Sequence, residues 1–390
     1  MNDFMYYNPV RVHFGADAMS CLPEELGKFG PNVLLTYGGG SIRRTGLYDR
    51  VTDALRAAGK NIFELSGIMP NPRTEKVYEG IELCRKHKID LILAVGGGST
   101  IDCSKAIAVG APAEGDFWEK FYVNWETAET GIPLGVILTI PATGSELDKS
   151  AVITNFATGE KNCYDSEWEF PRFAILDPTL TYSLPKNQMV NGIVDTMSHL
   201  MELYISPPDD GFLTDNLAEA AMRTEIAAAR RAVEEPTDYE ARASLMWTSS
   251  FALCGMLNNG KKTDWASHCI EHPLSALFDV AHGAGLAVVH PAYLEYICES
   301  GVPRLARFAR NVWGMEGGKE EALAAAGISA MVDFFRDLGL PTTIGALDII
   351  LTDGDLDRLA DGCSRGRSRS IGSLRVLDWD DMRAIYEAAR

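Results

Sequence analysis

Apolar and polar positions follow two different periods in the first half of the chain. Short apolar runs predict buried strands at 33–36, 61–65, 90–95 and 135–141, whereas a period of three to four residues predicts helices at 45–58, within 71–88 and from about 100. Val10, Val12 and Phe14 alternate with polar residues, which indicates a further strand at the edge of the sheet. Strands and helices that alternate in this order indicate a largely parallel sheet covered by helices on both faces, that is, an α/β domain.

The pattern changes near Asp177, and beyond it no segment alternates like a strand. Pro185, with Ser183 near the cap, marks the start of a first helix. Further helices are expected at 213–232, 238–258, 263–278, 283–299, 318–338 and 378–390, with a surface helix at 304–313 and an exposed loop at 365–372. We therefore predict an α/β domain over residues 1–184 and an all-helical domain over residues 185–390.

Length and composition limit the classes of protein to which the chain can belong. Its 390 residues suit two domains, and 46% hydrophobic and 23% charged residues are typical of a globular protein. The formal net charge of -18 repels phosphate backbones, so we expect no nucleic-acid partner. The sequence has no apolar run long enough for a membrane and no secretory signal at 1–10, and its eight cysteines form no CxxC pair. These features predict a cytoplasmic protein with reduced thiols.

Two glycine-rich turns follow predicted strands and are candidates for binding a nucleotide. They are Gly38-Gly39-Gly40-Ser41 and Gly96-Gly97-Gly98-Ser99. Glycine allows the backbone to approach a phosphate, and a helix N-terminus offers free N–H groups to an anion. The second turn opens a helix directly, so it is the better candidate for a pyrophosphate site. Neither turn has the GxGxxG spacing, and tight turns also use glycine without any ligand.

A third polar turn follows the strand at 135–141, at the edge where α/β sheets bind ligands. It carries Thr139, Thr143 and Ser145, which could contact a nucleotide or only cap the loop. Lys161 lies further along the chain, where its charge could meet a nucleotide or remain in solvent. These four residues are therefore further candidates for the nucleotide site, although each could have a structural role instead.

The first glycine turn bears on the choice of coenzyme. An acidic side chain near the adenosine ribose favours NAD, whereas a small or basic side chain admits the 2′-phosphate of NADP. No carboxylate occurs between Gly38 and Arg44, and Arg43 adds a second positive charge. We therefore predict NADP(H) in preference to NAD(H), with solvated arginines at a helix start as the alternative.

A carboxylate and four histidines recur at helical spacing between residues 195 and 282. Asp195 and His199 are four residues apart, as are His268 and His272, so each pair can share one face of a helix. His282 follows shortly after the second pair. Such a set predicts a divalent-metal site, and its imidazoles suit both Fe²⁺ and Zn²⁺. The alternative is a set of polar surface residues bonded to water or backbone.

The order and spacing of these motifs resemble the iron-containing (group III) alcohol dehydrogenases, and most closely their NADPH-dependent butanol dehydrogenase and aldehyde reductase branch. The resemblance covers nearly the whole chain. It rests on VRVHFG, YGGGSIRRTG, Asn71-Pro72, AVGGGSTIDCSKAIA, TIPATGSE, the segment from Asp177-Pro178 to His199, and HCIEHPLSALFDVAHGAGLAVVHP. It implies a Rossmann-like, dinucleotide-binding α/β domain followed by an all-helical, metal- and substrate-binding domain, the architecture that dehydroquinate synthase also has.

The resemblance also implies roles for individual residues. The metal ligands would be Asp195, His199, His268 and His282, with His272 beside the substrate and the nicotinamide. The turn at 96–99 would hold the pyrophosphate. The remaining cofactor contacts would come from Asn71, Asp102, Thr139, Thr143, Ser145 and Lys161, with Asp102 near the nicotinamide ribose.

At two positions this chain has a different residue from some of the relatives. Gly38 stands where NAD-preferring relatives tend to have Asp, which again favours NADP(H). His290-Pro291 departs from the apolar residue that many relatives have before this proline. We expect His290 to face away from the metal, with a supporting contact to the metal ligands as the alternative. The resemblance further implies a homodimer that forms through the N-terminal strand.

The expected reaction is hydride transfer between NADP(H) and a small aliphatic alcohol or aldehyde, in a site between the two domains. The metal would act as a Lewis acid toward the substrate oxygen. His272 could relay the alcohol proton; because it precedes Pro273, it could also be a turn residue. Met197, Leu200 and their apolar neighbours around the ligands would suit an apolar substrate.

Two other functions fit parts of the pattern. A non-redox metal enzyme like dehydroquinate synthase would need several Lys or Arg residues near the metal ligands, where this chain has apolar ones. A nucleotide- or metal-binding protein without catalysis would need an output module, and no segment of the sequence suggests one.

Overall fold

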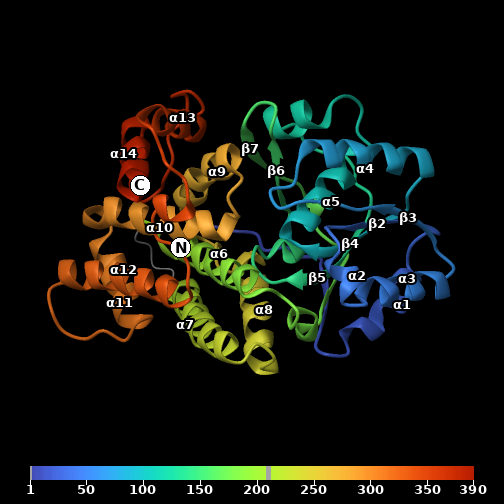
Figure 1. Ribbon diagram of the computed structural model, residues 1–390, viewed down its shortest axis with the longest axis horizontal. Helices are drawn as coiled ribbons and strands as arrows, with labels where there is room; N and C mark the ends of the chain where they lie inside the picture. Colours follow the sequence, from blue (N-terminus) through green and yellow to red (C-terminus); the bar gives the residue numbers. More distant parts are fainter. Residues whose placement is uncertain (1, 208–211) are drawn as a thin grey trace. The chain divides into compact units, whose positions relative to one another are not determined.

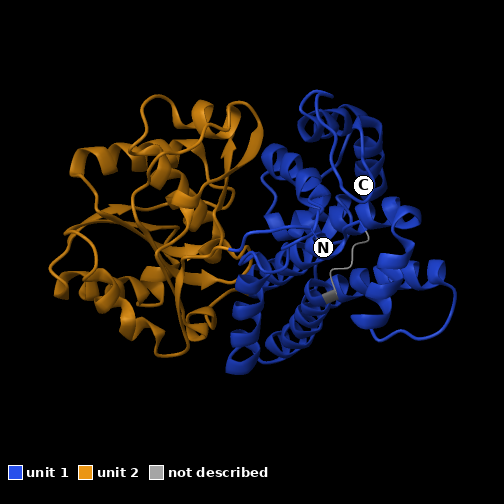
Figure 2. Cartoon of the chain, turned by 180° about the vertical axis from the view of Figure 1, so that it is seen from behind, with its two compact units in different colours: residues 1–6, 186–390 blue, residues 7–185 orange. Residues whose placement is uncertain are grey.

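The computed structural model describes residues 2–207 and 212–390, which form two compact units (Figure 2). One unit spans Tyr7–Pro185, and the other contains Lys186–Arg390 together with residues 2–6. The chain passes from the first unit to the second directly after Pro185. No helix in the described ranges combines the length and the apolar character needed to cross a membrane.

The first unit is built on a parallel six-stranded sheet. Its strands lie in the order β1-β8-β5-β4-β2-β3, and every neighbouring pair is parallel. The strands are β1 (Arg11–Phe14), β2 (Asn32–Tyr37), β3 (Asn61–Leu65), β4 (Leu91–Gly97), β5 (Leu134–Ile140) and β8 (Phe173–Leu176). The predicted parallel sheet is thus confirmed, and β1 lies at one edge of it as expected.

Helices cover both faces of this sheet (Figure 1). They are α1 (Leu22–Leu26), α2 (Ser41–Arg44), α3 (Leu47–Ala57), α4 (Thr74–His87) and α5 (Gly98–Gly110). The side of the sheet that α1, α2 and α3 cover is packed with alternate strand residues such as Val33, Leu35 and Leu93. Because α4 and α5 cover the opposite side, the central strands β2 and β4 are buried on both faces, so their sequences do not alternate between apolar and polar residues.

The sequence pattern did not predict the hairpin of β6 (Ser150–Asn155) and β7 (Glu160–Asp165). Its two strands are antiparallel and joined by a turn with Gly159 at a positive φ. Polar residues occupy both faces of β7, so it lacks the alternation on which the prediction depended. The shorter helices of this unit are η1 (Ala18–Cys21), η2 (Trp118–Val123), η3 (Ser145–Leu147), η4 (Glu167–Glu169) and η5 (Pro178–Thr181).

The second unit is helical throughout its described residues, apart from an isolated bridge between Ile371 and Leu377. Its longer helices are α6 (Lys186–Tyr204), α7 (Phe212–Glu234), α8 (Tyr239–Leu253), α9 (Ala266–Phe278), α10 (His282–Ile297), α11 (Val302–Asn311), α12 (Glu320–Asp337), α13 (Asp353–Ser364) and α14 (Trp379–Ala389). Two short helices, η6 (Cys298–Ser300) and η7 (Gly345–Leu347), complete it. The predicted all-helical architecture is confirmed, although α13 was not foreseen.

Two helices form the centre of this unit. Nearly every residue of α10 and of the second half of α6 is buried, so both helices are enclosed by the others. Helices that are surrounded in this way carry apolar residues on all faces. A polar residue on either helix therefore needs a specific partner, which makes the buried Asp195, His199 and His290 informative.

Candidate metal centre and cofactor site

The helical unit brings four of the predicted site residues together. Asp195 and His199 lie one turn apart on α6, and His199 Nδ1 is 3.4 Å from Asp195 Oδ1. His268 lies in the first turn of α9, and His282 is the first residue of α10. Three helices thus direct their donor atoms to one buried position.

A close approach of two helices places His282 there. A Cβ atom on Gly283 would lie 2.1 Å from the carbonyl oxygen of Asn191 on α6. Only glycine therefore allows the start of α10 to pack directly on the α6 backbone. His282 consequently starts its helix within reach of Asp195, one turn further along α6.

The donor atoms converge on Asp195. The Nε2 atoms of His268 and His282 each lie 3.7 Å from Asp195 Oδ1. One donor atom from each of these three residues lies within 4.8 Å of the other two. His199 lies beside this group, and its ring stacks on that of His268 with 4.4 Å between centroids.

Several of these atoms are buried without a hydrogen bond. Among residues 2–207 and 212–390, Asp195 Oδ1, His199 Nδ1 and His268 Nε2 are buried and have no hydrogen-bond partner. Leaving such atoms unsatisfied costs free energy, and native structures rarely do so. One carboxylate oxygen and imidazole nitrogens suit Fe²⁺ or Zn²⁺, so these residues fit a divalent cation.

The pKa values agree with this view of the site. Burial would raise the pKa of Asp195, but the imidazoles of His199 and His282 lower it to about 2. Burial lowers the pKa of His199 to about 3, although Asp195 opposes the shift. Burial also disfavours the charged form of His268, yet the Glu202 and Asp195 carboxylates raise its pKa to about 10. The site therefore favours an additional positive charge, which a bound cation would supply.

Two carboxylates that the sequence analysis did not single out border the histidines. Glu202 on α6 contacts His268 Nδ1, and Glu271 Oε2 on α9 lies 2.5 Å from His282 Nδ1. Each glutamate follows a candidate ligand by three residues, Glu202 after His199 and Glu271 after His268. That repeated H-x-x-E spacing was a usable signal, because residues three apart share a helix face.

Two further aromatic side chains lie near the centre. Trp265 packs edge-on against His199 and His268, with ring centroids 6.0 and 5.5 Å away, and it is 37% exposed. His272 lies within α9, so the alternative of a turn residue before Pro273 is wrong. Its ring centroid is 6.0 Å from that of His282. Pro273 is accommodated inside the helix.

His290 is a separate feature of the same helices. It is buried, and its two ring nitrogens have no hydrogen-bond partner in the described part of the chain. Burial lowers its pKa to about 3, so the imidazole is neutral. Its ring contacts Tyr293 edge-on at 6.4 Å.

The apolar residues expected to face a substrate belong to the core instead. Met197, Leu200, Ile270 and Leu274 are fully buried among the other helices. These four side chains therefore offer no surface to a ligand, and the prediction that they face an apolar substrate is wrong. Trp265 is the partly exposed apolar side chain that contacts the candidate ligands directly.

The α/β unit has its own candidate site at the carboxyl edge of the sheet. From β2 the chain moves outward to β3, and then returns to the other side of β2 to form β4 and β5. Parallel α/β sheets bind ligands at such a switch point. The turn 38–41 follows β2 and the turn 96–99 joins β4 to α5, so both predicted glycine turns flank it.

Neighbouring strands bring the third predicted turn to the same edge. Gly97 at the end of β4 pairs with Ile140 at the end of β5. A Cβ atom on Gly98 would lie 2.5 Å from two side-chain atoms of Thr143, so this loop packs against the start of α5. Thr139 is in β5 itself. These residues are adjacent, as the sequence analysis anticipated.

Two predicted cofactor residues are bonded inside the protein. Asp102 is buried, and its carboxylate accepts hydrogen bonds from the Ser145 hydroxyl at 2.6 Å and from the Val152 N–H at 3.0 Å. Burial raises the pKa of Asp102 to about 6. Asp102 and Ser145 therefore join α5 to the loop after β5 and to the hairpin.

Asn71 and Lys161 also meet. Lys161 Nζ donates to Asn71 Oδ1 at 3.2 Å, which links β7 to the turn before α4. Asn71 adopts a positive φ of 51°, a conformation that asparagine tolerates better than most residues. The two residues, 90 positions apart in the sequence, thus form one part of the unit.

The two arginines of the first turn differ in their contacts. Arg43 stacks on Tyr48 at 3.6 Å and donates to Tyr37 and Glu64 at 2.6 and 3.1 Å. Arg44 forms no ion pair with any other described residue and is exposed. The positive charges of Arg43 and Arg44 therefore differ, because Glu64 offsets that of Arg43 whereas Arg44 is exposed.

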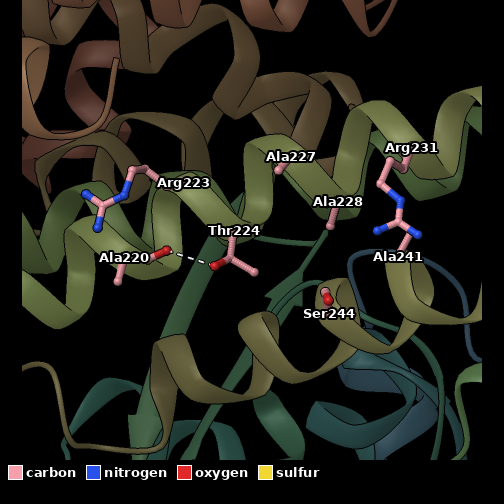
Figure 3. Close-up of a pocket in the computed structure, with 8 residues that line it drawn as sticks. All are labelled: Ala220, Arg223, Thr224, Ala227, Ala228, Arg231, Ala241 and Ser244. Atoms are coloured by element: carbon pink, nitrogen blue, oxygen red, sulfur yellow. Dashed lines mark hydrogen bonds between the residues drawn. The ribbon is translucent and has the colours of Figure 1, made fainter. Parts of the chain in front are cut away.

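One hollow lies elsewhere, on the surface between α7 and α8 (Figure 3). Its volume is about 380 Å³, and none of its lining residues is a predicted site residue. Its two cations are engaged, since Arg231 bonds Asp238 and Arg223 donates to the carbonyl of Asn311. The hollow therefore carries no argument about the metal or cofactor sites.

Comparisons with known proteins agree with this description. The family model for iron-containing alcohol dehydrogenase matches residues 9–178, and the model for the C-terminal part of that family matches residues 189–390. The NADH-dependent butanol dehydrogenase A of Clostridium acetobutylicum is 41% identical, over 99% of both chains. The NADPH-dependent aldehyde reductase YqhD of Escherichia coli is 37% identical, over 100% of both chains.

A solved structure is similarly close. The NADH-dependent butanol dehydrogenase A of Thermotoga maritima superimposes with a TM-score of 0.95 at 38% identity, over 100% of this chain and 99% of that one. The two family models together span most of the 390 residues, and the relatives match end to end. This chain therefore belongs to the iron-containing alcohol dehydrogenase family.

Proposed function

We propose that the protein transfers hydride between NADP(H) and a small aliphatic alcohol or aldehyde, with the help of one divalent metal ion. The observation that carries this proposal is the convergence of Asp195, His268 and His282, with His199 beside them, in a chain of this enzyme family. The ligand set is proposed as these four residues, and Fe²⁺ or Zn²⁺ as the ion. When bound, such an ion supplies Lewis-acid chemistry toward an alcohol or carbonyl oxygen.

The chain's own residues would position the reactants. Asp195 is ionised and His199 neutral at ordinary pH, which are the forms that bind a cation. Trp265 offers an apolar, partly exposed surface beside the imidazoles, which suits an aliphatic substrate. His272, near His282, is the proposed group that relays the alcohol proton.

The coenzyme would bind at the carboxyl edge of the sheet. The N-terminus of α5, with residues 96–99, is the proposed pyrophosphate site, because free N–H groups there favour an anion. Asn71, Asp102, Thr139, Thr143, Ser145 and Lys161 are the proposed surrounding residues. A preference for NADP(H) is supported by Arg44 and by the missing carboxylate at Gly38–Ser41, and the paired Arg43 contributes less.

Two further features support a homodimer and a cytoplasmic location as part of this proposal. The edge strand β1 has its sheet partner β8 on one side, so a second copy of the chain could pair with its other edge as a homodimer. All eight cysteines are free thiols, as expected in a reducing compartment such as the cytoplasm.

A substrate panel tests the proposed function. Full-length protein reconstituted with Fe²⁺ or Zn²⁺ is mixed with NADPH and aliphatic aldehydes, and absorbance at 340 nm is followed. Steady loss of NADPH with aldehyde is the expected result, with a lower kcat/KM for NADH. No turnover with any aldehyde or alcohol, despite bound metal, would leave a non-redox or a purely binding role.

A further inference from the structure

We infer that Glu202 and Glu271 are a matched pair of positioning residues that fix the tautomers of His268 and His282 at the metal centre. The inference rests on the proposed function, because it concerns the same metal site. Each glutamate acts on one histidine from the side opposite Asp195, and neither is itself proposed as a ligand.

Glu202 is held by the start of α9. Its carboxylate is 1% exposed, and Oε1 accepts hydrogen bonds from the backbone N–H groups of Ser267 and His268 at 2.7 and 3.2 Å. These N–H groups belong to the first turn of a helix, where they lack partners within the helix and favour a negative charge. The other oxygen, Oε2, is thereby directed to His268 Nδ1.

Glu271 is held in an equally specific way. It is fully buried; Oε1 is bonded by the Ser275 hydroxyl one turn further along α9, and Oε2 lies 2.5 Å from His282 Nδ1. A Cβ atom on Gly285 would lie 2.7 Å from Oε1 and 2.9 Å from Cγ of Glu271. The glycine on α10 therefore leaves the space that this side chain occupies.

The chemistry of these contacts determines which nitrogen carries the proton. An ionised carboxylate can only accept hydrogen bonds, so the Nδ1 atom of each histidine must donate. In a neutral imidazole the lone pair is then on Nε2. The two Nε2 atoms are those that lie 3.7 Å from Asp195 Oδ1, so each histidine, in its neutral form, presents its electron pair at the same position.

The connections also link the three helices in a chain. Glu202 on α6 holds the histidine of α9, and Glu271 on α9 holds the histidine of α10. Carboxylates that bond ligating histidines in this way typically change metal affinity by 10- to 100-fold when they are removed. Neither glutamate needs to touch substrate or coenzyme for that effect.

The test measures metal affinity directly. Glu271→Gln and Glu202→Gln are made in the full chain, and the affinity for Co²⁺ is measured by competition with a chelator, together with the visible absorption spectrum of bound Co²⁺. We expect each variant to bind Co²⁺ 10- to 100-fold more weakly, with a changed spectrum, because the amide removes the charge that holds the Nδ1 proton.

Glu219→Gln is the matched control. Glu219 is also a buried glutamate of the helical unit, but it bonds Tyr204 and Arg307 instead of a histidine. It should lower stability without changing the Co²⁺ spectrum. An equal loss of affinity in the control would show that general destabilisation explains the effect, and would overturn the inference.

Other outcomes are equally decisive. Co²⁺ affinities within twofold of the wild type, with an unchanged spectrum, would refute the positioning role. If Glu271→Gln does not fold, Gly285→Ala keeps the charge but presses on Oε1, and it should weaken Co²⁺ binding in the same direction; unchanged binding would refute the role of Glu271. A wild-type protein that binds no metal would refute the proposed function itself.

Discussion

Gly98→Ala tests whether the start of α5 forms the coenzyme site. A methyl group on Gly98 would lie 2.5 Å from Cγ2 and Oγ1 of Thr143 and 3.0 Å from its Cβ, whereas ordinary contacts are 3.4–4 Å. Thr143 cannot move freely, since its Oγ1 accepts a hydrogen bond from the Ser145 N–H at 3.2 Å. The substitution must therefore displace the loop after β5, the start of α5, or both.

The size of the effect follows from this overlap. Forcing an extra carbon into a packed region costs about 1–3 kcal/mol. If the displaced segments bind the coenzyme, a loss of that size weakens NADPH binding by roughly 5- to 150-fold, since about 1.4 kcal/mol corresponds to a factor of ten. Calorimetric titration with NADPH measures the affinity, and thermal unfolding measures the cost to the fold.

Two further variants make the result interpretable. Thr143→Ala removes the two closest atoms, so the double variant with Gly98→Ala should recover much of the lost affinity in a double-mutant cycle. Gly39→Ala meets no heavy atom within 4 Å, so it should leave the stability unchanged and report only the approach of the coenzyme. NADPH affinity in Gly98→Ala equal to that of the wild type would refute the assignment of this turn.

Three other changes have defined outcomes. His268→Ala should lose bound metal and turnover together while NADPH still binds; full turnover without detectable metal would contradict the ligand set. Glu64→Gln should raise the NADPH-to-NADH ratio of kcat/KM roughly 3- to 10-fold, because Arg43 loses its carboxylate partner and can meet a 2′-phosphate; an unchanged ratio would exclude Arg43 from coenzyme choice. Burial alone would raise the pKa of Glu25, but its hydrogen bonds to Lys28, His13 and Arg11 lower this pKa to about 2. The ionised carboxylate therefore stabilises the fold above pH 4.5. This stabilisation is lost as the pH falls toward 2. Glu25→Gln should therefore lower the unfolding free energy by about 2 kcal/mol at pH 6, after allowance for its exposed partners, and by much less at pH 2.5. If the difference in unfolding free energy between the wild type and the variant does not shrink in acid, the ion pairs of Glu25 are not its cause.

The sequence predicted most of the sheet because buried strands have a simple signature. The apolar runs at 33–36, 61–65, 90–95 and 135–141 each became a strand of the sheet. The hairpin was missed because β7 is polar on both faces, and its contacts come from α5 and from Asn71, which lie far away in the sequence. The period of apolar residues within a short segment does not reveal contacts with residues that are far away in the sequence.

Helix α13 shows a different limit. Its segment contains two glycines and four aspartates, which argue against a helix by propensity. The structure forms it nevertheless, with a capping box between Thr352 and Asp355 and with Leu356 and Leu359 buried in the core. Tertiary burial outweighed a propensity that is worth less than 1 kcal/mol per residue.

The candidate metal centre was predictable in part, for a physical reason. Spacing along one helix identifies residues that share a face, so Asp195 with His199 could be found from the sequence. Which histidine meets which carboxylate depends on helix packing, and the contacts of Glu202 and Glu271 run between helices. Burial of Met197 and Leu200 was equally invisible, which is why the argument for an apolar pocket chose the wrong residues.

The proposed metal residues and the proposed coenzyme residues belong to different units, so the two sites can be tested separately. Every proposed metal ligand, and both glutamates that bond the ligating histidines, belong to the helical unit, whereas every proposed coenzyme residue belongs to the α/β unit. A variant in one set should therefore change one affinity and leave the other within about twofold, because the two sets have no residue in common and substitutions without shared partners usually behave additively. Metal affinity that fell in Gly98→Ala, or NADPH affinity that fell in Glu271→Gln, would show that the two sites are coupled. The proposed reaction needs both the metal ion and the coenzyme, so activity alone could not show which of the two sites a variant affects. Separate measurements of metal affinity and NADPH affinity can.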